Sequence, residues 1–152
     1  MNVEQKLSEL GLILPAPSKP AGSYQPWIIE GNLLFISGQF PIENGQLRFI
    51  GRVGMELTEE QGHQAARLAG LNVLAQIRSA LGGFDRLVTL ARVEGHIASA
   101  PDWNNAPPVL DGASNLFNVV LGERGRHTRT AFTPSHLPYN LAIELVVTAV
   151  IR

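Results

Sequence analysis

The segment from Leu141 to Ile151 consists of Leu, Ala, Ile, Val and one Thr, with a single ionisable side chain, Glu144. This composition, bounded upstream by Pro138 and Asn140, is typical of a long β-strand. Side chains alternate between the two faces of a strand, so the odd-numbered residues share one apolar face and Glu144 lies on the other. A carboxylate among apolar side chains is costly unless it is paired, hydrogen-bonded or protonated. The strand therefore predicts a carboxylate with a special role.

Arg129, in the strand-like segment 127–132, is the nearest upstream cation that can pair with Glu144. On neighbouring strands, the two charges form either a structural ion pair or a ligand site. Arginine offers a planar fork that binds a carboxylate through two hydrogen bonds. A glutamate in an apolar setting can orient or deprotonate a water. The spacing alone leaves both interpretations open, because structural ion pairs also perturb charges.

The composition limits the class of protein. A chain of 152 residues is long enough for one domain, residues 1–152, but too short for two ordinary ones. A formal net charge of −1 argues against recruitment of nucleic acid by counterion release. Charged residues make up 16% of the chain, which favours burial of part of its surface in a homo-oligomer. The absence of cysteine excludes disulfides, thiol nucleophiles and thiolate metal sites.

Several other functional classes lack their motifs. The histidines do not have metal-site spacing, so we expect no metal. Ser37-Gly38 lacks the elbow of a hydrolase nucleophile, and there is no phosphate loop or dinucleotide motif. The N-terminus from Asn2 to Leu10 is polar, unlike a signal peptide, and no stretch approaches the ~20 apolar residues of a membrane span. We therefore expect a cytoplasmic protein that does not enter membranes.

Helical periodicity and capping signals predict the helices. Residues 3–11 favour a short leading helix, and residues 1–21 as a whole read as an N-terminal extension and connector. Thr58 to Gln61 has capping-box spacing and opens a helix that ends at Gly82. Small residues around Gly70 in this helix predict a close approach to a sheet. A second helix is expected at roughly 108–121.

Strand signals complete the fold prediction. Val/Ile-rich or alternating segments bounded by turn residues are expected to form strands at residues 27–30, 33–37, 46–50, 87–98, 128–132 and 141–151. The order of hairpins, helix, strand, helix and two strands predicts an α+β fold, with both helices packed on one face of a single sheet.

At these residues the chain resembles the RidA/YjgF family, whose members are also called L-PSP endoribonucleases. The C-terminal motifs are Arg129-Thr-Ala131, Leu137-Pro138 and Ile143-Glu144-Leu145. The N-terminal motifs are Gly22-Ser-Tyr24-Gln25, Gly31-Asn32, Phe35-Ile-Ser37-Gly38-Gln39 and Asn44-Gly45. The resemblance covers most of residues 15–151 in order, and the spacing from Arg129 to Glu144 matches without gaps.

The resemblance implies a fold and an activity. The family has a chorismate-mutase-like α+β fold and forms homotrimers, whose sheets make a central barrel with ligand clefts between subunits. Its founding members hydrolyse small 2-imino or enamine acids to 2-keto acids and ammonia without a cofactor. By similarity, Arg129 binds the carboxylate of the small-molecule substrate and Glu144 positions the hydrolytic water. Tyr24 lines the cleft, Ser37 and Gly38 shape its wall, and the backbone of Ala131 contacts the ligand.

Departures from the family pattern indicate a divergent subgroup. The chain has extra residues at its N-terminus and in the loop from Pro101 to Pro108, and the family's asparagine near the second helix falls on Gly112. Phe132-Thr133-Pro134 replaces the usual alternation of valine and acid. These changes favour a changed ligand, so a non-catalytic module that binds small carboxylates is the alternative to the deaminase. An endoribonuclease is less favoured, because the chain lacks a basic stripe.

Overall fold

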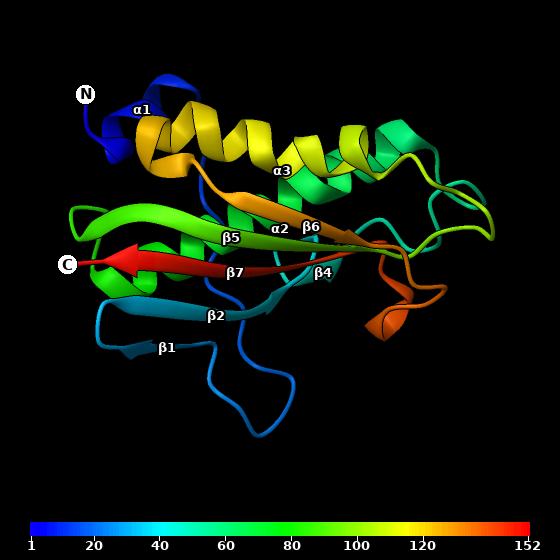
Figure 1. Ribbon diagram of the computed structural model, residues 1–152, viewed down its shortest axis with the longest axis horizontal. Coiled ribbons are helices and arrows are strands. Elements are labelled where there is room, and N and C mark those ends of the chain that lie inside the picture. The colour runs from blue at the N-terminus through cyan, green and yellow to red at the C-terminus, as the bar shows by residue number, and fades with distance from the viewer.

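A mixed five-stranded sheet is the framework of the molecule (Figure 1). In the computed structural model, which describes residues 1–152, the strand order is β1-β2-β7-β5-β6. All neighbouring strands are antiparallel except β5 and β6, which are parallel. The strands are β1 (Trp27–Glu30), β2 (Leu33–Gln39), β5 (Leu87–Ile97), β6 (Thr128–Phe132) and β7 (Ile143–Ile151). A separate small hairpin is formed by β3 (Ile42–Glu43) and β4 (Gln46–Leu47).

Three helices accompany the sheet: α1 (Val3–Glu9), α2 (Glu59–Leu81) and α3 (Ala106–Leu121). Figure 1 shows α2 behind the sheet and α3 running alongside β6, so the two long helices cover the same face. The short α1 packs against α3. The predicted α+β class, with both long helices on one face of a single main sheet, is confirmed. No helix is both long and apolar enough to cross a bilayer.

The boundaries of α2 follow from its capping residues. Thr58 accepts a hydrogen bond from the backbone N–H of Gln61, whose side chain accepts one from the N–H of Thr58. This reciprocal arrangement satisfies two backbone donors that the first helical turn leaves free. At the other end, Gly82 adopts φ +69°, a left-handed conformation that glycine enters without steric cost. Local sequence thus defines both ends of this helix.

Close contact between α2 and α3 depends on two glycines. A Cβ atom on Gly112 would overlap the carbonyl oxygen of His63 in α2. Gly70 of α2 faces Ala113 and Leu116 of α3. The predicted approach of α2 to the sheet is present, since α2 contacts β2 and β7, but Gly70 itself faces α3 instead of the sheet. Small residues permit a close approach, but they do not specify which element approaches.

β7 lies at the centre of the sheet, between β2 and β5, and its side chains alternate as predicted. Its odd-numbered residues are buried under the helices, whereas Glu144 and the other even-numbered residues are half-buried on the opposite face. The strand is shorter than predicted and begins at Ile143. The predicted strand 46–50 also ends early, at Leu47, because Phe49 adopts a left-handed φ of +61° that breaks the extended backbone.

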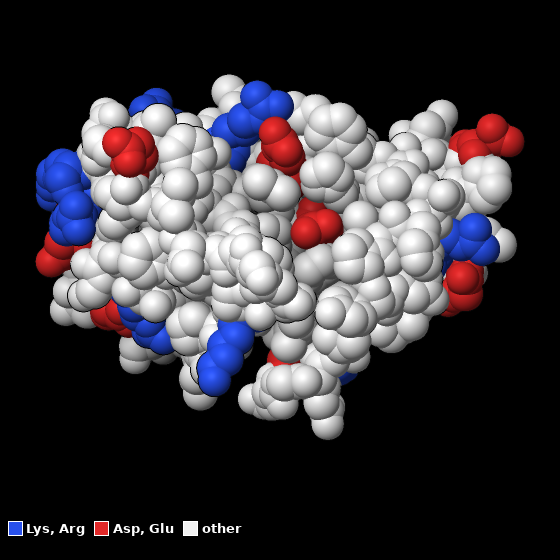
Figure 2. All heavy atoms as spheres, turned by 90° about the horizontal axis from the view of Figure 1, so that it is seen from below, with Lys and Arg blue, Asp and Glu red and all other residues white.

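The face of the sheet opposite the helices is covered by no other element of this chain; we call it the open face. Ile28, Phe35 and Thr148 lie side by side on it in register, and Ile28 and Phe35 are 52% and 40% exposed. Viewed from the β1 side, the molecule shows large uncharged areas between a few groups of charged side chains (Figure 2). Neighbouring exposed apolar side chains such as Ile28 and Phe35 are typical of a protein–protein contact.

Candidate functional site

Arg129 and Glu144 lie on opposite faces of the sheet. Arg129 is aligned with Val93 of β5, and Val93 is aligned with Val147 of β7, a residue of the buried, helix-facing side. Glu144 is aligned instead with His96, on the open face. The expectation that the two charges occupy neighbouring strands was wrong, because β5 pairs with both β6 and β7 and lies between them. Within one chain they form neither an ion pair nor a common site.

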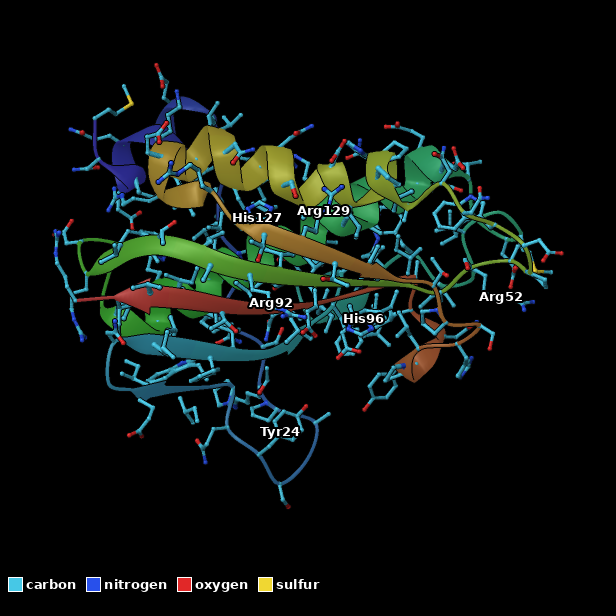
Figure 3. All side chains as sticks on the ribbon, in the orientation of Figure 1. Tyr24, Arg52, Arg92, His96, His127 and Arg129 are labelled. Carbon is cyan, nitrogen blue, oxygen red and sulfur yellow. The ribbon has the colours of Figure 1, made fainter.

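The first half of the candidate site, which we call the arginine half-site, consists of Asp111, Ser114, His127 and Arg129. Nη1 of Arg129 lies 2.7 Å from Oδ1 of Asp111 and 3.0 Å from Oγ of Ser114, both on α3. Figure 3 shows Arg129 and His127 next to each other beneath α3. An open hollow beside them is lined by Ser114, Asn118, Arg126, His127 and Arg129. The arginine is thus held by its own chain at the rim of a polar hollow.

The second half, which we call the glutamate half-site, consists of Tyr24, Ser37, Gly38 and Glu144. A Cβ atom on Gly38 would overlap the carboxylate of Glu144, so the absence of a side chain at Gly38 makes room for this group. Burial raises the pKa of the Glu144 carboxyl above its ordinary value of 4.5, while the nearby His96 acts in the opposite direction. Glu144 is therefore a more basic carboxylate than an exposed one.

Tyr24 and Ser37 border a cleft next to this carboxylate. The Oγ of Ser37 donates a hydrogen bond to the carbonyl of Gln25 at 2.6 Å, which ties the end of β2 to the N-terminal connector. The Tyr24 hydroxyl accepts a hydrogen bond from the N–H of Ala21. In Figure 3, Tyr24 lies on the connector, at the edge of the sheet away from Arg129. The cleft residues relevant here are Lys19, Tyr24, Ser37, Gly38 and Tyr139.

Ala131, the other predicted ligand contact, lies on the same strand as Arg129. It is exposed and aligned with Gly95 of β5. The structure therefore groups the predicted residues into two sets: Arg129 with Ala131 on β6, and Tyr24, Ser37 and Gly38 with Glu144. No three His, Asp or Glu side chains come together as metal ligands.

Three polar residues of the arginine half-site were not found from the sequence: Asp111, Ser114 and His127. Asp111 and Ser114 are three residues apart on a helix, so they lie on one face of it, but this spacing alone does not identify a partner. His127 was considered only as a metal ligand. His96, aligned with Glu144 and stacked on Phe132 at 4.9 Å between ring centroids, was also missed.

Comparison with known proteins identifies the family. A profile of the family described as "YjgF/chorismate_mutase-like, putative endoribonuclease" matches residues 4–150. Protein TCP17 of Trypanosoma cruzi is 35% identical over 144 residues, which cover 94% of this chain and 90% of that protein. The chain belongs to the YjgF/RidA family.

Solved structures share the fold over almost the whole chain. A "putative endoribonuclease" of Shewanella oneidensis MR-1 has a TM-score of 0.96 and 36% identity, covering 99% of this chain and 100% of that one. The E. coli protein TdcF, solved with bound serine, has a TM-score of 0.65 and 21% identity, covering 92% and 96%. At this identity, TdcF is evidence for the fold alone.

Proposed function

We propose that this protein hydrolyses small 2-imino or enamine acids to 2-keto acids and ammonia, without a cofactor, in clefts between the subunits of a homotrimer. The observation that carries the proposal is the division of the site. Arg129 and Glu144 lie on opposite faces of one sheet, so a single small ligand can contact both only if they come from different subunits. Membership of the YjgF/RidA family supports the activity and the assembly.

The open face supports an assembly of this kind. Ile28 and Phe35 expose apolar surface that monomeric proteins usually cover. The free edge of β6 carries the arginine half-site, whereas the glutamate half-site lies near β2, toward the other edge of the sheet. Closed rings bring different surface patches of neighbouring copies together. In a ring of three, each arginine half-site would meet the glutamate half-site of a neighbour.

The two half-sites offer complementary chemistry. The Arg129 guanidinium can hold a substrate carboxylate in a fixed orientation, which presents the imine carbon to a bound water. Glu144, made more basic by burial, takes a proton from this water as its oxygen attacks the imine carbon. Proton transfer to nitrogen and cleavage of the C–N bond then release ammonia and leave the 2-keto acid. Serine, the molecule bound in the E. coli TdcF structure, is also small and carries a carboxylate.

One observation favours the alternative, a module that binds small carboxylates without turnover. The Asp111 carboxylate already neutralises part of the Arg129 charge at 2.7 Å. A ligand must therefore bind beside an existing ion pair. Its preferred chemistry then differs from that of a ligand bound by an arginine without a carboxylate partner. Of the two functions, the deaminase accounts better for the basic, half-buried Glu144, because binding a carboxylate needs no second carboxylate.

The decisive experiment measures ammonia release from imines generated in situ by an amino-acid oxidase or a serine/threonine dehydratase. The wild-type protein is expected to accelerate release. Arg129→Ala is expected to lose at least about tenfold in rate, and Arg129→Lys also to be weak because an ammonium cannot reproduce the planar fork. The matched control is Arg78→Ala, which removes an arginine that belongs to neither half-site and pairs with Glu4 at 3.2 Å; it should keep the wild-type rate.

The outcomes separate the functions. Ammonia release no faster than the uncatalysed reaction, together with binding of pyruvate that needs Arg129, would establish the binding module instead. Near wild-type turnover in Arg129→Lys would reject bidentate recognition of the carboxylate. Cleavage of RNA by the wild-type protein that Arg129→Ala abolishes would favour the endoribonuclease description over both.

A further inference from the structure

A continuous chain of hydrogen bonds runs behind Arg129. Nδ1 of His127 lies 2.6 Å from the carbonyl oxygen of Gly125. Nε2 of the same ring lies 2.8 Å from Oγ of Ser114, and this oxygen lies 3.0 Å from Nη1 of Arg129. Both Ser114 and Gly125 are buried, and Ser114 is only 8% exposed. The chain therefore connects a buried backbone carbonyl to the guanidinium at the hollow.

The direction of each hydrogen bond follows from the chemistry of its ends. A backbone carbonyl only accepts, so Nδ1 of His127 must carry a proton. In the neutral ring Nε2 is then an acceptor, and the hydroxyl of Ser114 donates to it. The Ser114 oxygen is left to accept from Arg129. Each donor in the chain has one acceptor, and this fixes the tautomer of His127.

The chain of hydrogen bonds also determines which edge of the Arg129 guanidinium is free to bind a ligand. Nη1 carries two hydrogens, and these are directed to Oδ1 of Asp111 and Oγ of Ser114. An anion must therefore use the edge formed by Nε and Nη2, which supplies two parallel N–H groups. A long arginine side chain loses much rotamer freedom when it binds a ligand. A side chain that is already held in place loses less of it on binding.

We propose that Ser114 and His127 are positioning residues that hold Arg129 with its Nε–Nη2 edge directed to the ligand carboxylate. This role rests on the proposed function, because it assigns these residues to the carboxylate-binding half of the same site. Neither residue touches the reacting atoms. Ser114 acts through Arg129, and His127 acts through Ser114.

The packing around Gly125 fixes the backbone carbonyl at which the chain of hydrogen bonds begins. A Cβ atom at Gly125 would overlap the carbonyl oxygen of Phe117 in α3. The absence of a side chain lets the turn at Gly122–Gly125 lie directly against α3. The Phe117 ring also meets the His127 ring edge-on, at 5.9 Å between centroids. Packing thus holds the His127 ring in the plane that its two hydrogen bonds require.

The test compares four variants of the full-length protein. Ser114→Ala removes the acceptor for Arg129, and His127→Leu removes both ring nitrogens. His127→Gln keeps one donor and one acceptor on a planar group, so it tests rescue. His136→Ala, in an exposed loop, is the control for loss of a histidine. The measurements are KM and kcat for imine hydrolysis, the dissociation constant of pyruvate by calorimetry, and ¹⁵N NMR of the histidine rings.

We expect KM and the pyruvate dissociation constant to rise about tenfold in Ser114→Ala and His127→Leu, with kcat within about twofold, as for loss of uniform binding. His127→Gln should recover most of the affinity, and His136→Ala should match the wild type. The NMR spectrum should show His127 protonated at Nδ1 and unprotonated at Nε2. Ser114→Ala should shift the Nε2 resonance.

Unchanged affinity in Ser114→Ala and His127→Leu, or a His127 ring protonated at Nε2 instead of Nδ1, would overturn the positioning role. Equal losses in His127→Gln and His127→Leu would also do so. If the wild type releases no ammonia but the pyruvate affinities follow the expected order, the deaminase fails and the positioning role stands. If the wild type binds no pyruvate and hydrolyses no imine, both proposals fall.

Discussion

At the scale of single residues, the position of the Glu144 side chain depends on the absence of a side chain at Gly38. The carboxylate occupies the space that a side chain at Gly38 would fill, and it lies on the half-buried face of β7 without an arginine partner. Because Arg129 pairs with Asp111, the structural ion pair that Glu144 was expected to form as one possibility does not exist. A half-buried carboxylate without a salt-bridge partner is costly, and such groups are often found at functional sites.

Glu144→Gln is predicted to lower the rate of imine hydrolysis by about a hundredfold or more, since it removes a general base, while the affinity for pyruvate changes little. The glutamine keeps the shape of the side chain but cannot accept the proton of the attacking water. Ammonia release and calorimetry on one preparation measure both quantities. A variant with wild-type turnover would return Glu144 to a purely structural role.

Glu144→Gln is also predicted to change how the free energy of unfolding depends on pH. The folded-state pKa of Glu144 is raised above 4.5, so its protonated form stabilises the fold below the unfolded pKa, and this contribution is lost as pH rises through the folded pKa. Glu144→Gln does not titrate. As pH rises through the folded-state pKa of Glu144, the free energy of unfolding of Glu144→Gln minus that of the wild type should therefore increase. Above that pKa the difference should stay constant. Urea denaturation between pH 4 and pH 8 measures the difference. A relative loss of wild-type stability on acidification would contradict it.

Gly38→Ala is predicted to cost about 1–3 kcal/mol of stability, because the new methyl group overlaps the Glu144 carboxylate. Gly38 does not have a left-handed φ, so backbone strain does not contribute. In a Glu144→Ala background the same change should cost much less. A double-mutant cycle by urea denaturation measures this coupling. Additive costs would show that the two residues do not compete for space.

At the scale of elements, the two long helices are defined in different ways. The ends of α2 follow from its own capping residues, whereas the position of α3 follows from its contact with α2 at Gly112. The family's asparagine falls on Gly112 in this chain, and here the position serves helix packing. This contact fixes where Asp111 and Ser114 lie, and they in turn hold Arg129.

Gly112→Ala is predicted to destabilise the protein by about 1–3 kcal/mol, because its Cβ meets the backbone of His63 and a backbone cannot rotate away. The helices must separate, so the affinity for pyruvate should fall as well. Asn115→Ala, at an exposed position of the same helix, is the matched control and should change neither quantity. Thermal denaturation and calorimetry serve as the readouts, and an unaffected Gly112→Ala variant would rule out the close contact.

At the scale of the whole molecule, the open face predicts assembly. Light scattering is expected to give a mass of about three times 16.5 kDa at micromolar concentration. Phe35→Glu would place a charge on the open face beside Ile28 and should shift the population toward monomers with reduced turnover. Ser79→Glu, at an exposed position of α2, adds the same charge away from the open face and should leave the mass unchanged. A monomeric wild type would remove both the trimer and the site between subunits.

Mixing inactive subunits tests whether each site is shared. Arg129→Ala and Glu144→Gln should each be inactive alone. In random mixed trimers one cleft of three receives both native residues, so unfolding and refolding the two together should restore roughly one quarter of the wild-type rate. Two weak variants of the same half-site, Arg129→Ala and Arg129→Lys, should restore no activity beyond the sum of their own rates. No recovery in the first mixture would place Arg129 and Glu144 in the same subunit's cleft, or in none.

What the sequence determined by itself is local. Thr58 and Gln61 predict the start of α2, and the composition of 141–151 predicts a strand with Glu144 on the less apolar face, because capping and alternation depend only on neighbouring residues. The resemblance that rests on Arg129 and Glu144 also led to the correct family. Only the tertiary structure decided how these residues relate to one another. β5 pairs with both β6 and β7, which separates Arg129 from Glu144, and α3 brings Asp111 to the arginine. Strand order and helix position arise from the packing of segments far apart in the chain, and no local spacing encodes them.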